Sequence, residues 1–297
     1  DEIVLDDNGS TDSTLQVARW FGVEPGVGPS PLEAGFDEAR NQTVARATGD
    51  VILWIDADEE LLDPRHLPKY LRWSLFDGFA VAQHHFSAVP QNAFKPDLPV
   101  RIFRRTRLDG KPTGIRFYGV VHEPPEIAIN QSVGQSIVLS DVHIAHFGYL
   151  TETVRRQRFE RNIPLMFRDR VKYPDRVLGK FLMIRDWVHL ARYDIERNGR
   201  QISGEAAQYL ESAVAAFQKD FLGQTHMMAI DGLAYYNEAL QHLGRGFEVN
   251  IVIKVGGIDG LPHEIQYSGR VASPEDLTLL VAGGARDLSS IWHGEYV

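Results

Sequence analysis

The stretch "DVILWIDADEE", residues 50–60, decides the fold of this chain. The apolar run from Val51 to Ile55 is followed at once by four carboxylates. A continuous apolar run is typical of a strand that is covered on both faces of a parallel sheet. Carboxylates this close together raise one another's pKa unless a cation or a dipole compensates them. The stretch therefore predicts a buried strand whose carboxyl end carries a functional cluster.

The composition limits the classes of protein that fit. A chain of 297 residues suits one large or two modest domains, and 43% apolar with 24% charged residues is typical of a globular protein. The net charge of −9 argues against nucleic-acid binding through bulk charge, and the absence of cysteine excludes disulfides and thiolate metal sites. No apolar run approaches the ~18 residues of a membrane span, and no signal peptide is visible. We expect a soluble, cytoplasmic protein.

Charge is distributed unevenly along the chain. Residues 1–60 hold 14 acidic and three basic residues, whereas residues 151–200 hold 13 Lys or Arg and seven acidic residues. Solvated helix faces explain this pattern, and we favour that interpretation. The other interpretation is a basic surface that meets an anionic acceptor, a lipid or a partner.

The alternation of strands and helices over residues 1–150 predicts an α/β sheet domain. Strands are expected at residues 2–7, 51–57, 78–88, 99–105, 115–123 and 136–148, and helices at residues 10–22 and 31–49.

Two further regions follow this domain. Residues 151–245 predict a helical extension, because apolar residues recur three or four apart. Its helices are expected at residues 153–171, 177–199, 204–221 and 226–245. A plain bundle is favoured, although "GLAYYNEALQHLGR" also resembles a tetratricopeptide helix. Residues 246–297 predict a small β-rich segment that serves oligomerisation or acceptor binding. Its strands are expected at residues 247–257 and 263–272, joined by a Gly-rich turn.

Two stretches carry candidate chemistry. In "VLDDNGSTDST" a strand ends in Asp6 and Asp7 and is followed by a turn and by helix-capping residues. Open α/β sheets bind ligands at this end of a strand, where a carboxylate accepts hydrogen bonds from a base N–H or a ribose hydroxyl. The alternative is that these residues form an ordinary strand, turn and helix with acidic capping residues and bind no ligand. In "DADE", Asp56 and Asp58 form an Asp-x-Asp pair that can hold a divalent cation, which in turn can bridge two phosphates.

Together these stretches resemble the family 2 glycosyltransferases, which have the GT-A nucleotide-sugar-binding fold. The matching phrases are "DEIVLDDNGSTDST", "ARNQTVARATGDVILWIDADEE", "RIFRR", "FYGVVHE" and "HIAHFGYL", in family order over residues 1–150. The later phrases look most like bacterial and phage members with helical C-terminal extensions. The resemblance implies an inverting, metal-dependent transfer of sugar from a nucleotide-sugar, most often a UDP-sugar, to an acceptor hydroxyl.

The resemblance also implies roles for individual residues in donor binding. Asp7 matches the aspartate that contacts the nucleotide base, and Asp6 lies beside it. Arg40 of "ARN" matches an arginine that approaches the nucleotide. Asp56 is expected to contact the ribose or the sugar. Arg101 of "RIFRR" is expected to contact phosphate or acceptor, the alternative being an ordinary charge on a strand face.

The implied metal is Mn²⁺ or Mg²⁺, and of the Asp-x-Asp pair Asp58 is the expected ligand. His146 in "HIAHFGY" matches a histidine that can complete the metal site, and neutral imidazole suits Mn²⁺ better than Mg²⁺. The alternative for His146 is a hydrogen-bonded core histidine.

Glu123 in "VVHEPPE" is the candidate general base. Inverting transfer needs a carboxylate that takes the acceptor's proton as the hydroxyl attacks the anomeric carbon. A Glu before Pro-Pro lies on a stiff, extended segment, which suits positioning. His122 is expected to orient Glu123 or to contact the acceptor. A surface turn carboxylate is the alternative for Glu123.

The chain departs from the family at its start, because the strand and helix that normally precede the "DEIV" strand are absent. We therefore expect either a truncated chain or a sheet that lacks its first strand. The rival function is a catalytically degenerate domain that acts as a binding scaffold. Retention of Asp7, Asp58, Glu123 and His146 together favours the enzyme.

Two smaller rivals are disfavoured. A hydrolytic metal site would need His143 and His146, which are three apart and point to opposite faces of a strand. A nucleotidyltransferase would need a Gly-rich basic loop after its first strand. The sequence leaves the acceptor open among protein, lipid carrier, glycan and modified DNA base. Oligomeric state is open too, homo-oligomers included.

Overall fold

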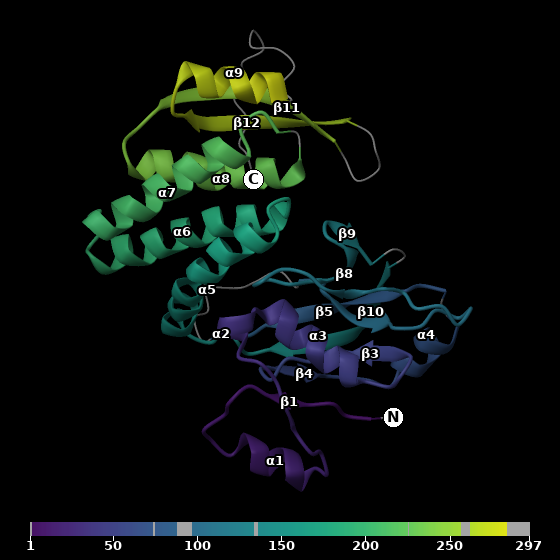
Figure 1. Ribbon diagram of the computed structural model, residues 1–297. Coiled ribbons are helices and arrows are strands. Elements are labelled where there is room, and N and C mark those ends of the chain that lie inside the picture. Colours follow the sequence, from purple (N-terminus) through teal and green to yellow (C-terminus); the bar gives the residue numbers. More distant parts are fainter. Residues whose placement is uncertain are drawn as a thin grey trace. The chain divides into compact units, whose positions relative to one another are not determined.

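The chain divides into two units in the computed structural model (Figure 1). One unit comprises Asp1–Arg158 and Pro164–Arg176, and the other comprises Phe159–Ile163 and Val177–Val297. The residues that the structure describes are 2–73, 75–87, 97–133, 136–224, 226–256 and 262–283. The predicted division at residues 150 and 245 stays a prediction. No helix of the described residues has both the length and the apolar character that crossing a membrane requires.

Most strands in the first unit are short, the exceptions being β5 and β10, and most of them lie after residue 50. They are β1 (Asp6–Asp7), β2 (Gly26–Val27), β3 (Val51–Leu53), β4 (Glu59–Leu61), β5 (Gly78–His85), β6 (Val100–Arg104), β7 (Arg116–Phe117), β8 (Pro125–Ala128), β9 (Gln131–Ser132) and β10 (Ser136–His146). The helices are α1 (Thr14–Trp20), α2 (Pro31–Ala34), α3 (Phe36–Arg46), α4 (Leu67–Trp73) and α5 (Glu152–Lys172), and α5 also contributes to the second unit.

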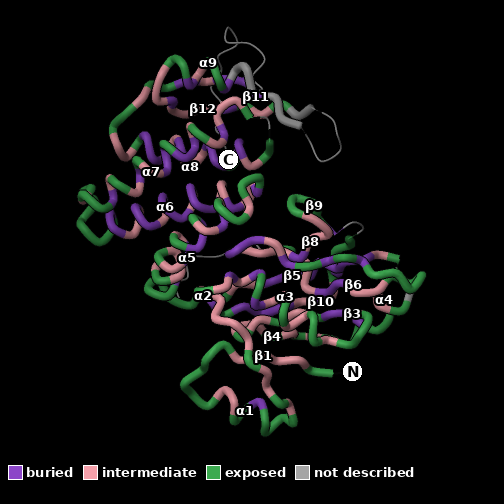
Figure 2. The backbone as a smooth tube through the Cα atoms, viewed as in Figure 1, coloured by how far each residue is buried: buried purple, intermediate pink, exposed green. Residues whose placement is uncertain are grey.

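A five-stranded mixed sheet forms the centre of this unit, in the order β3-β6-β5-β10-β4 among the described residues. Strands β5 and β10 are parallel, and the other neighbours are antiparallel. Ile102 and Phe103 are adjacent in β6, so their side chains point to opposite faces. Ile102 packs in one apolar cluster with Leu67 of α4, and Phe103 packs in another with Phe117 of β7. The buried strands of the sheet are visible in Figure 2.

The predicted strand at residues 51–57 differs from the observed one. It is only three residues long, it lies at the edge of the sheet, and it pairs antiparallel to β6. Only Ile52 of its three residues is buried. The expectation of a strand buried on both faces of a parallel sheet is therefore wrong. The apolar run instead pairs with one neighbour, β6, and the chain turns after Asp56 to form β4, which was not predicted.

Three other predicted elements are shorter than expected. The strand at residues 2–7 is reduced to β1, which pairs in parallel with β2. The helix at residues 31–49 is broken at Gly35, whose φ of 109° is a backbone conformation that favours glycine. The strand at residues 115–123 ends with β7, because positive φ angles at Gly119 (118°) and His122 (55°) turn the backbone into a loop.

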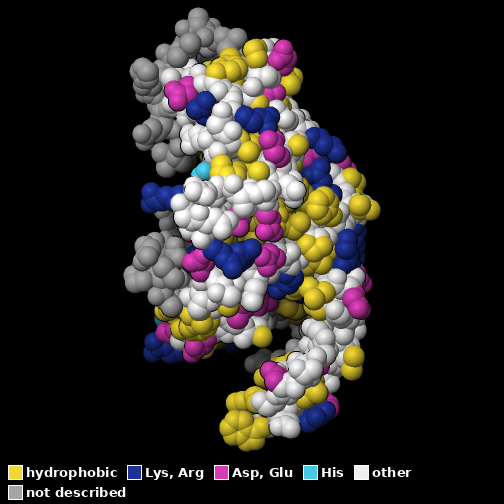
Figure 3. Space-filling model, turned by 90° about the vertical axis from the view of Figure 1, so that its left-hand side faces the viewer, with side chains coloured by type: hydrophobic (Ala, Val, Ile, Leu, Met, Phe, Trp, Pro, Cys, Tyr) yellow, Lys and Arg dark blue, Asp and Glu magenta, His cyan; other side chains and the backbone are white. Residues whose placement is uncertain are grey.

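Helix α1 packs only loosely on this unit. Ala18 is its only buried residue. Its exposed hydrophobic side chains include Val17 and Trp20, and Trp20 is 82% exposed. Hydrophobic side chains accordingly gather at the lowest part of the molecule in Figure 3, which is the α1 segment of Figure 1.

The second unit contains helices and a hairpin, close to the predicted positions. Its further elements are α6 (Val177–Arg197), α7 (Gly204–Asp220), α8 (Met227–His242), β11 (Phe247–Gly256), β12 (Pro262–Val271) and α9 (Pro274–Gly283). Leu210, Phe217, Leu233 and Tyr236 are fully buried in its core. Helix α9 was not predicted, and the expected turn at residues 257–261 and the end of the tail, residues 284–297, lie outside the described residues. The predicted fold class, a mixed α/β sheet followed by a helical region and a small β-rich C-terminal tail, is confirmed, and β11 and β12 form the tail as a hairpin.

Candidate active site

The carboxylates at the end of β1 bond within the fold. Asp7 accepts hydrogen bonds from the backbone N–H groups of Ser10 (3.1 Å) and Gly9 (3.0 Å), and bonding to Ser10 and Gly9 lowers the pKa of Asp7. The side chain of Asp6 is 3% exposed and accepts a hydrogen bond from Thr43 Oγ1 at 2.8 Å. In the described part of the chain, no hydrogen bond or ion pair joins either residue to the carboxylates after β3. The predicted contact of Asp6 and Asp7 with a nucleotide stays a prediction.

Asp56 lies after the end of β3 and is held by two arginines. Arg40 Nη1 lies 2.9 Å from Asp56 Oδ1, and Arg101 Nη2 donates to Asp56 Oδ2 at 3.0 Å. Trp54 Nε1 donates to Asp56 Oδ1 at 2.8 Å. Burial opposes the ionisation of Asp56, but the two guanidinium groups outweigh it and lower the pKa of Asp56 to about 2. These arginines are the cations that make the carboxylate cluster tolerable.

Glu59 is another carboxylate that bonds within this cluster. Its side chain is fully buried and bonds to Arg101 and to the Gln83 amide. Its Oε2 accepts the backbone N–H of Asp56 at 2.9 Å. A fully buried carboxylate is tolerated only when it is paired, so Arg101 serves two acids at once.

Arg40 also connects Asp56 to the predicted base. Arg40 Nε lies 2.5 Å from Glu123 Oε1, and the Glu123 side chain is 5% exposed. The Arg40 guanidinium lies over the rings of Trp54 (4.8 Å) and Phe117 (5.3 Å), which fixes its orientation. Burial raises the pKa of Glu123, although Arg40 opposes the rise. The structure thus brings Arg40, Asp56, Arg101 and Glu123 into one network.

Asp58 and His146 meet because β4 pairs with β10. The register places His146 opposite Glu59, one residue after Asp58. His146 Nε2 lies 3.4 Å from Asp58 Oδ2, and Arg158 Nη1 lies 3.8 Å from the same oxygen. Hydrogen bonding to His146 lowers the pKa of Asp58. A carboxylate oxygen and an imidazole nitrogen at this separation suit two neighbouring ligands of one ion.

A second histidine orients His146. The two Nδ1 atoms of His85 and His146 are 2.7 Å apart, and His85 Nε2 lies 2.9 Å from Asp97 Oδ2. His84 and His143 form a separate pair at 3.0 Å. Because His146 bonds to His85 through Nδ1, its Nε2 faces Asp58. Among the described residues no group of three or more His, Asp or Glu side chains is arranged to hold a metal ion.

Three residues of this network were not singled out from the sequence as site residues. Glu59 and Trp54 bond to the arginines or to Asp56, as described above. Asn41 donates to the Phe117 carbonyl and accepts from the Phe117 N–H, both at 2.8 Å, and so ties α3 to β7. Glu59 and Trp54 belong to the quoted stretch, and Asn41 directly follows Arg40. Closeness in sequence to predicted site residues is the signal by which these three residues could have been found.

His122 lies in the loop between β7 and β8, directly before Glu123, and its φ is 55°. Its backbone carbonyl accepts a hydrogen bond from Arg176. The predicted role of the His122 side chain, to orient Glu123 or contact an acceptor, stays a prediction.

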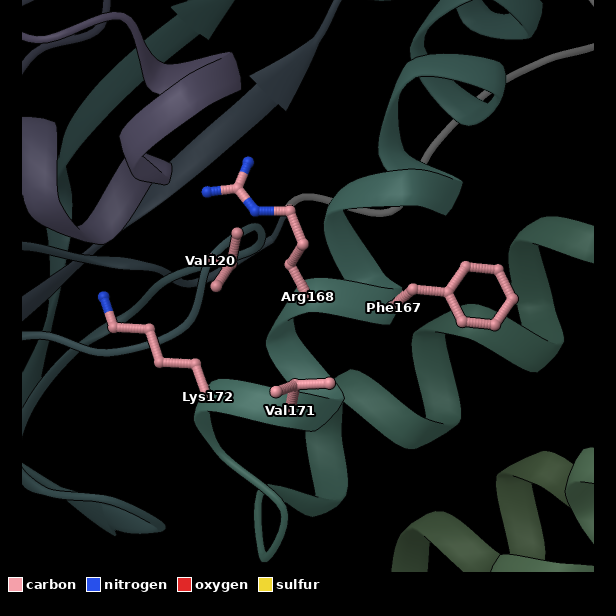
Figure 4. A pocket seen from close by; sticks show the side chains of 5 residues that line it. All are labelled: Val120, Phe167, Arg168, Val171 and Lys172. Carbon is pink, nitrogen blue, oxygen red and sulfur yellow. The ribbon is translucent and has the colours of Figure 1, made fainter.

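A hollow of about 410 Å³ lies beside the same loop, between Val120 and one side of α5. Figure 4 shows Arg168 and Lys172 leaving α5 on the side of Val120, whereas Phe167 points away. Both cations are already bonded: Arg168 donates to the backbone carbonyls of Leu32 and Glu33 in α2, and Lys172 Nζ lies 2.8 Å from Asp37 Oδ2. Arg168 and Lys172 therefore hold the fold together, and the choice between solvated helix faces and a basic binding surface for residues 151–200 stays a prediction.

The low pKa of Asp56 makes the stability of the protein depend on pH. The pKa is about 2 in the fold against 3.8 ordinarily, so the ionised Asp56 stabilises the fold above about pH 4, and this contribution disappears as pH falls through 2. With the side chain 25% exposed, the contribution is about 2 kcal/mol. We expect the stability advantage of wild type over Asp56→Asn, measured by urea unfolding, to shrink between about pH 4 and pH 2. An advantage that is constant over this interval would contradict the pairing.

Comparison with known proteins gives a family match over most of this unit. A family model described as Glycosyl transferase family 2 matches residues 1–130. A TPR repeat-containing protein of Synechococcus elongatus is 44% identical over 62 residues, which are 21% of this chain, and the chain spans only 15% of the length of this curated relative.

Solved structures of S. aureus TarS are distant likenesses. TarS 1-349 in complex with UDP-GlcNAc is 14% identical with a TM-score of 0.45, covering 92% of this chain and 90% of that one. A second structure of S. aureus TarS has a TM-score of 0.42 at 14% identity, covering 91% of this chain and 55% of that one. The family model confirms the resemblance that the sequence predicted. Residues 1–130 of this chain form a glycosyl transferase family 2 domain.

Proposed function

We propose that this protein is an inverting, metal-dependent glycosyltransferase that transfers a sugar from a UDP-sugar to an acceptor hydroxyl. The observation that carries the proposal is the network in which Arg40 pairs with both Asp56 and Glu123. Two residues after Asp56, Asp58 lies against His146. The choice of UDP rests on the family resemblance alone.

In the proposed reaction the acceptor oxygen forms a bond to the anomeric carbon. The bond between that carbon and the diphosphate oxygen breaks, and the diphosphate leaves with the electron pair. Glu123 takes the proton of the acceptor hydroxyl, and its burial favours this because a raised pKa makes the carboxylate a stronger base. Arg101 and Arg40 supply positive charge close to where the diphosphate is released.

The metal part of the proposal rests on the donor atoms of Asp58 and His146. Their separation of 3.4 Å and their oxygen and nitrogen chemistry fit a Mn²⁺ or Mg²⁺ ion, with Mn²⁺ favoured by the imidazole. Such an ion, when bound, neutralises the charge of the departing diphosphate. Asp58 and His146 are prepared for this by Arg158 and His85, which orient them.

A thermal-shift panel tests the proposal. UDP, GDP, CDP and dTDP are each added with and without Mn²⁺, since a ligand that binds only the native state raises the melting temperature. We expect UDP to give the largest shift and Mn²⁺ to increase it. A larger shift with another nucleotide would replace UDP as the donor nucleotide, and a shift unaffected by Mn²⁺ would remove the metal. The absence of a shift with all four would favour a scaffold that has lost its donor site.

A further inference from the structure

The loop that carries Glu123 has an unusual backbone. The loop is closed by a hydrogen bond from Tyr118 N to the Pro124 carbonyl at 3.2 Å. Between these residues, Gly119 has a φ of 118° and His122 a φ of 55°. A residue other than glycine reaches positive φ only at a cost, so such a loop keeps its shape when neighbouring groups hold it.

A buried ion pair lies against this loop. Arg176 Nη1 donates to both carboxylate oxygens of Asp169, at 3.0 and 3.1 Å, and the two side chains are 2% and 1% exposed. The end of α5 fixes both residues: Tyr173 N donates to the Asp169 carbonyl at 2.7 Å, and Arg176 N donates to the Tyr173 carbonyl at 3.0 Å. The pair is therefore presented by a hydrogen-bonded turn.

The pair binds three consecutive residues of the loop. Asp169 Oδ1 accepts the N–H of Val120 at 2.7 Å. Arg176 Nη1 donates to the Val121 carbonyl at 3.1 Å, and its Nη2 donates to the carbonyl of His122. The last of these bonds acts on the residue with positive φ that directly precedes Glu123.

Gly119 shows how closely the guanidinium approaches the loop. A Cβ atom at this position would lie 2.3 Å from Arg176 Cζ and 2.4 Å from Nη1, so the guanidinium would have to leave its present position. The glycine is thus required both by its φ and by the arginine. The glycine in the sequence, its positive φ and the close approach of the guanidinium are therefore consistent with one another.

We propose that Asp169 and Arg176 are positioning residues that hold the β7–β8 loop in the shape that places the Glu123 carboxylate at Arg40. The inference rests on the proposed function of Glu123 as the base. Arg176 spreads its bonds over two nitrogens in a fixed planar fork, Nη1 to Asp169 and the Val121 carbonyl and Nη2 to the His122 carbonyl. The single nitrogen of a lysine does not reproduce this geometry, so lysine does not replace Arg176. The loop keeps a separate tie to α3, because Phe36 N donates to the Val120 carbonyl at 2.8 Å, and so loss of Arg176 loosens the loop without releasing it.

Hydrogen exchange of the full-length protein tests the positioning directly. We expect Arg176→Lys to speed the exchange of the amides of residues 120–123 by about tenfold or more. The matched control is Arg104→Lys, because Arg104 is 4% exposed and also donates to two backbone carbonyls, those of Leu71 and Phe76. The control should leave the exchange of the loop unchanged. Unchanged exchange of the loop in Arg176→Lys would overturn the proposal.

A second variant guards against misfolding of the first. Asp169→Asn keeps the size of the side chain and one carbonyl oxygen for Val120 N, but removes the charge that Arg176 pairs with. We expect it to speed the exchange of the same amides, by less than Arg176→Lys. If both variants leave the exchange of the loop as in wild type, the pair does not hold it.

Kinetics separate positioning from a merely structural role. The probes are UDP-glucose, UDP-galactose and UDP-N-acetylglucosamine with water as acceptor, and the readout is released UDP. We expect Arg176→Lys to lower kcat by about 10- to 100-fold with an unchanged KM for the donor. Combined with Glu123→Gln it should cause no further loss, because both changes act through one group.

The outcomes distinguish the two claims. If Glu123→Gln is as active as wild type, or wild type releases no UDP from any probe, the proposed function fails. If Glu123→Gln is slow but Arg176→Lys is not, or if the two losses multiply, the positioning inference fails while Glu123 stays the base.

Discussion

Glu123→Gln is expected to lower the rate of UDP release by about 1,000-fold while the protein still binds the donor with wild-type affinity. The amide is nearly the size of the carboxylate, and it can still accept a hydrogen bond from Arg40 where Glu123 now lies 2.5 Å away. It cannot take a proton from the acceptor, so only the chemical step should be lost. Turnover of UDP-sugars and calorimetric titration with UDP measure the two quantities separately.

The matched control is Glu126→Gln, three residues further on in β8, which should keep the wild-type rate. The pH profile gives a second readout. Burial raises the pKa of Glu123 above the ordinary value of 4.5, so the carboxylate is protonated, and the rate falls, at a higher pH than for an exposed glutamate. A rate for Glu123→Gln within a few-fold of wild type would exclude Glu123 as the base.

Asp58→Asn is expected to lower the affinity for UDP on the order of 100-fold in the presence of Mn²⁺, because it removes an anionic ligand of the ion. Without Mn²⁺ the same change should leave the affinity unchanged or raise it, because a carboxylate repels the diphosphate. The loss of affinity should therefore appear only in the presence of the metal. Titration calorimetry with UDP, with Mn²⁺ and with EDTA, measures both values.

Asp63→Asn is the matched control for this change. Asp63 follows β4 closely and pairs with the neighbouring Arg65, so it should not affect nucleotide affinity in either condition. An affinity of Asp58→Asn that falls equally with and without Mn²⁺ would assign Asp58 to direct contact with the nucleotide instead of the ion.

The elements that local patterns define were predicted well. Helices α6, α7 and α8 begin and end within about three residues of their expected positions, because an apolar face at helical spacing and a glycine or capping residue at the ends are local signals. Strands β5 and β10 were also predicted, because an apolar run of strand length is likewise a local signal. The grouping of Asp58 with His146, and of Arg40 with the DADE stretch, came from the family resemblance, and the structure brings both groups together.

Features that depend on distant pairing could not be predicted. The edge position of β3 follows from its single partner β6, about 50 residues later. Strand β4 exists because Glu59–Leu61 pair with the end of β10, although the run of acids gives no strand signal. The pairing of Glu59 with Arg101, and of Arg176 with the loop before Glu123, joins residues more than 40 positions apart. A single sequence does not report such contacts.

Helix α5 determines where this protein can be cut. Most of α5 belongs to the first unit, namely its residues up to Arg158 and those from Pro164 onward. The helix nevertheless lies after residue 150, where the sequence predicted the first domain to end. A fragment that stops at residue 150 would lose Arg158 beside Asp58 and the pair that holds the Glu123 loop. It would also leave the Val121 carbonyl without its donor. Deletion series, gene fusions and domain exchanges that aim to keep the transferase half intact should therefore place their junction after Arg176.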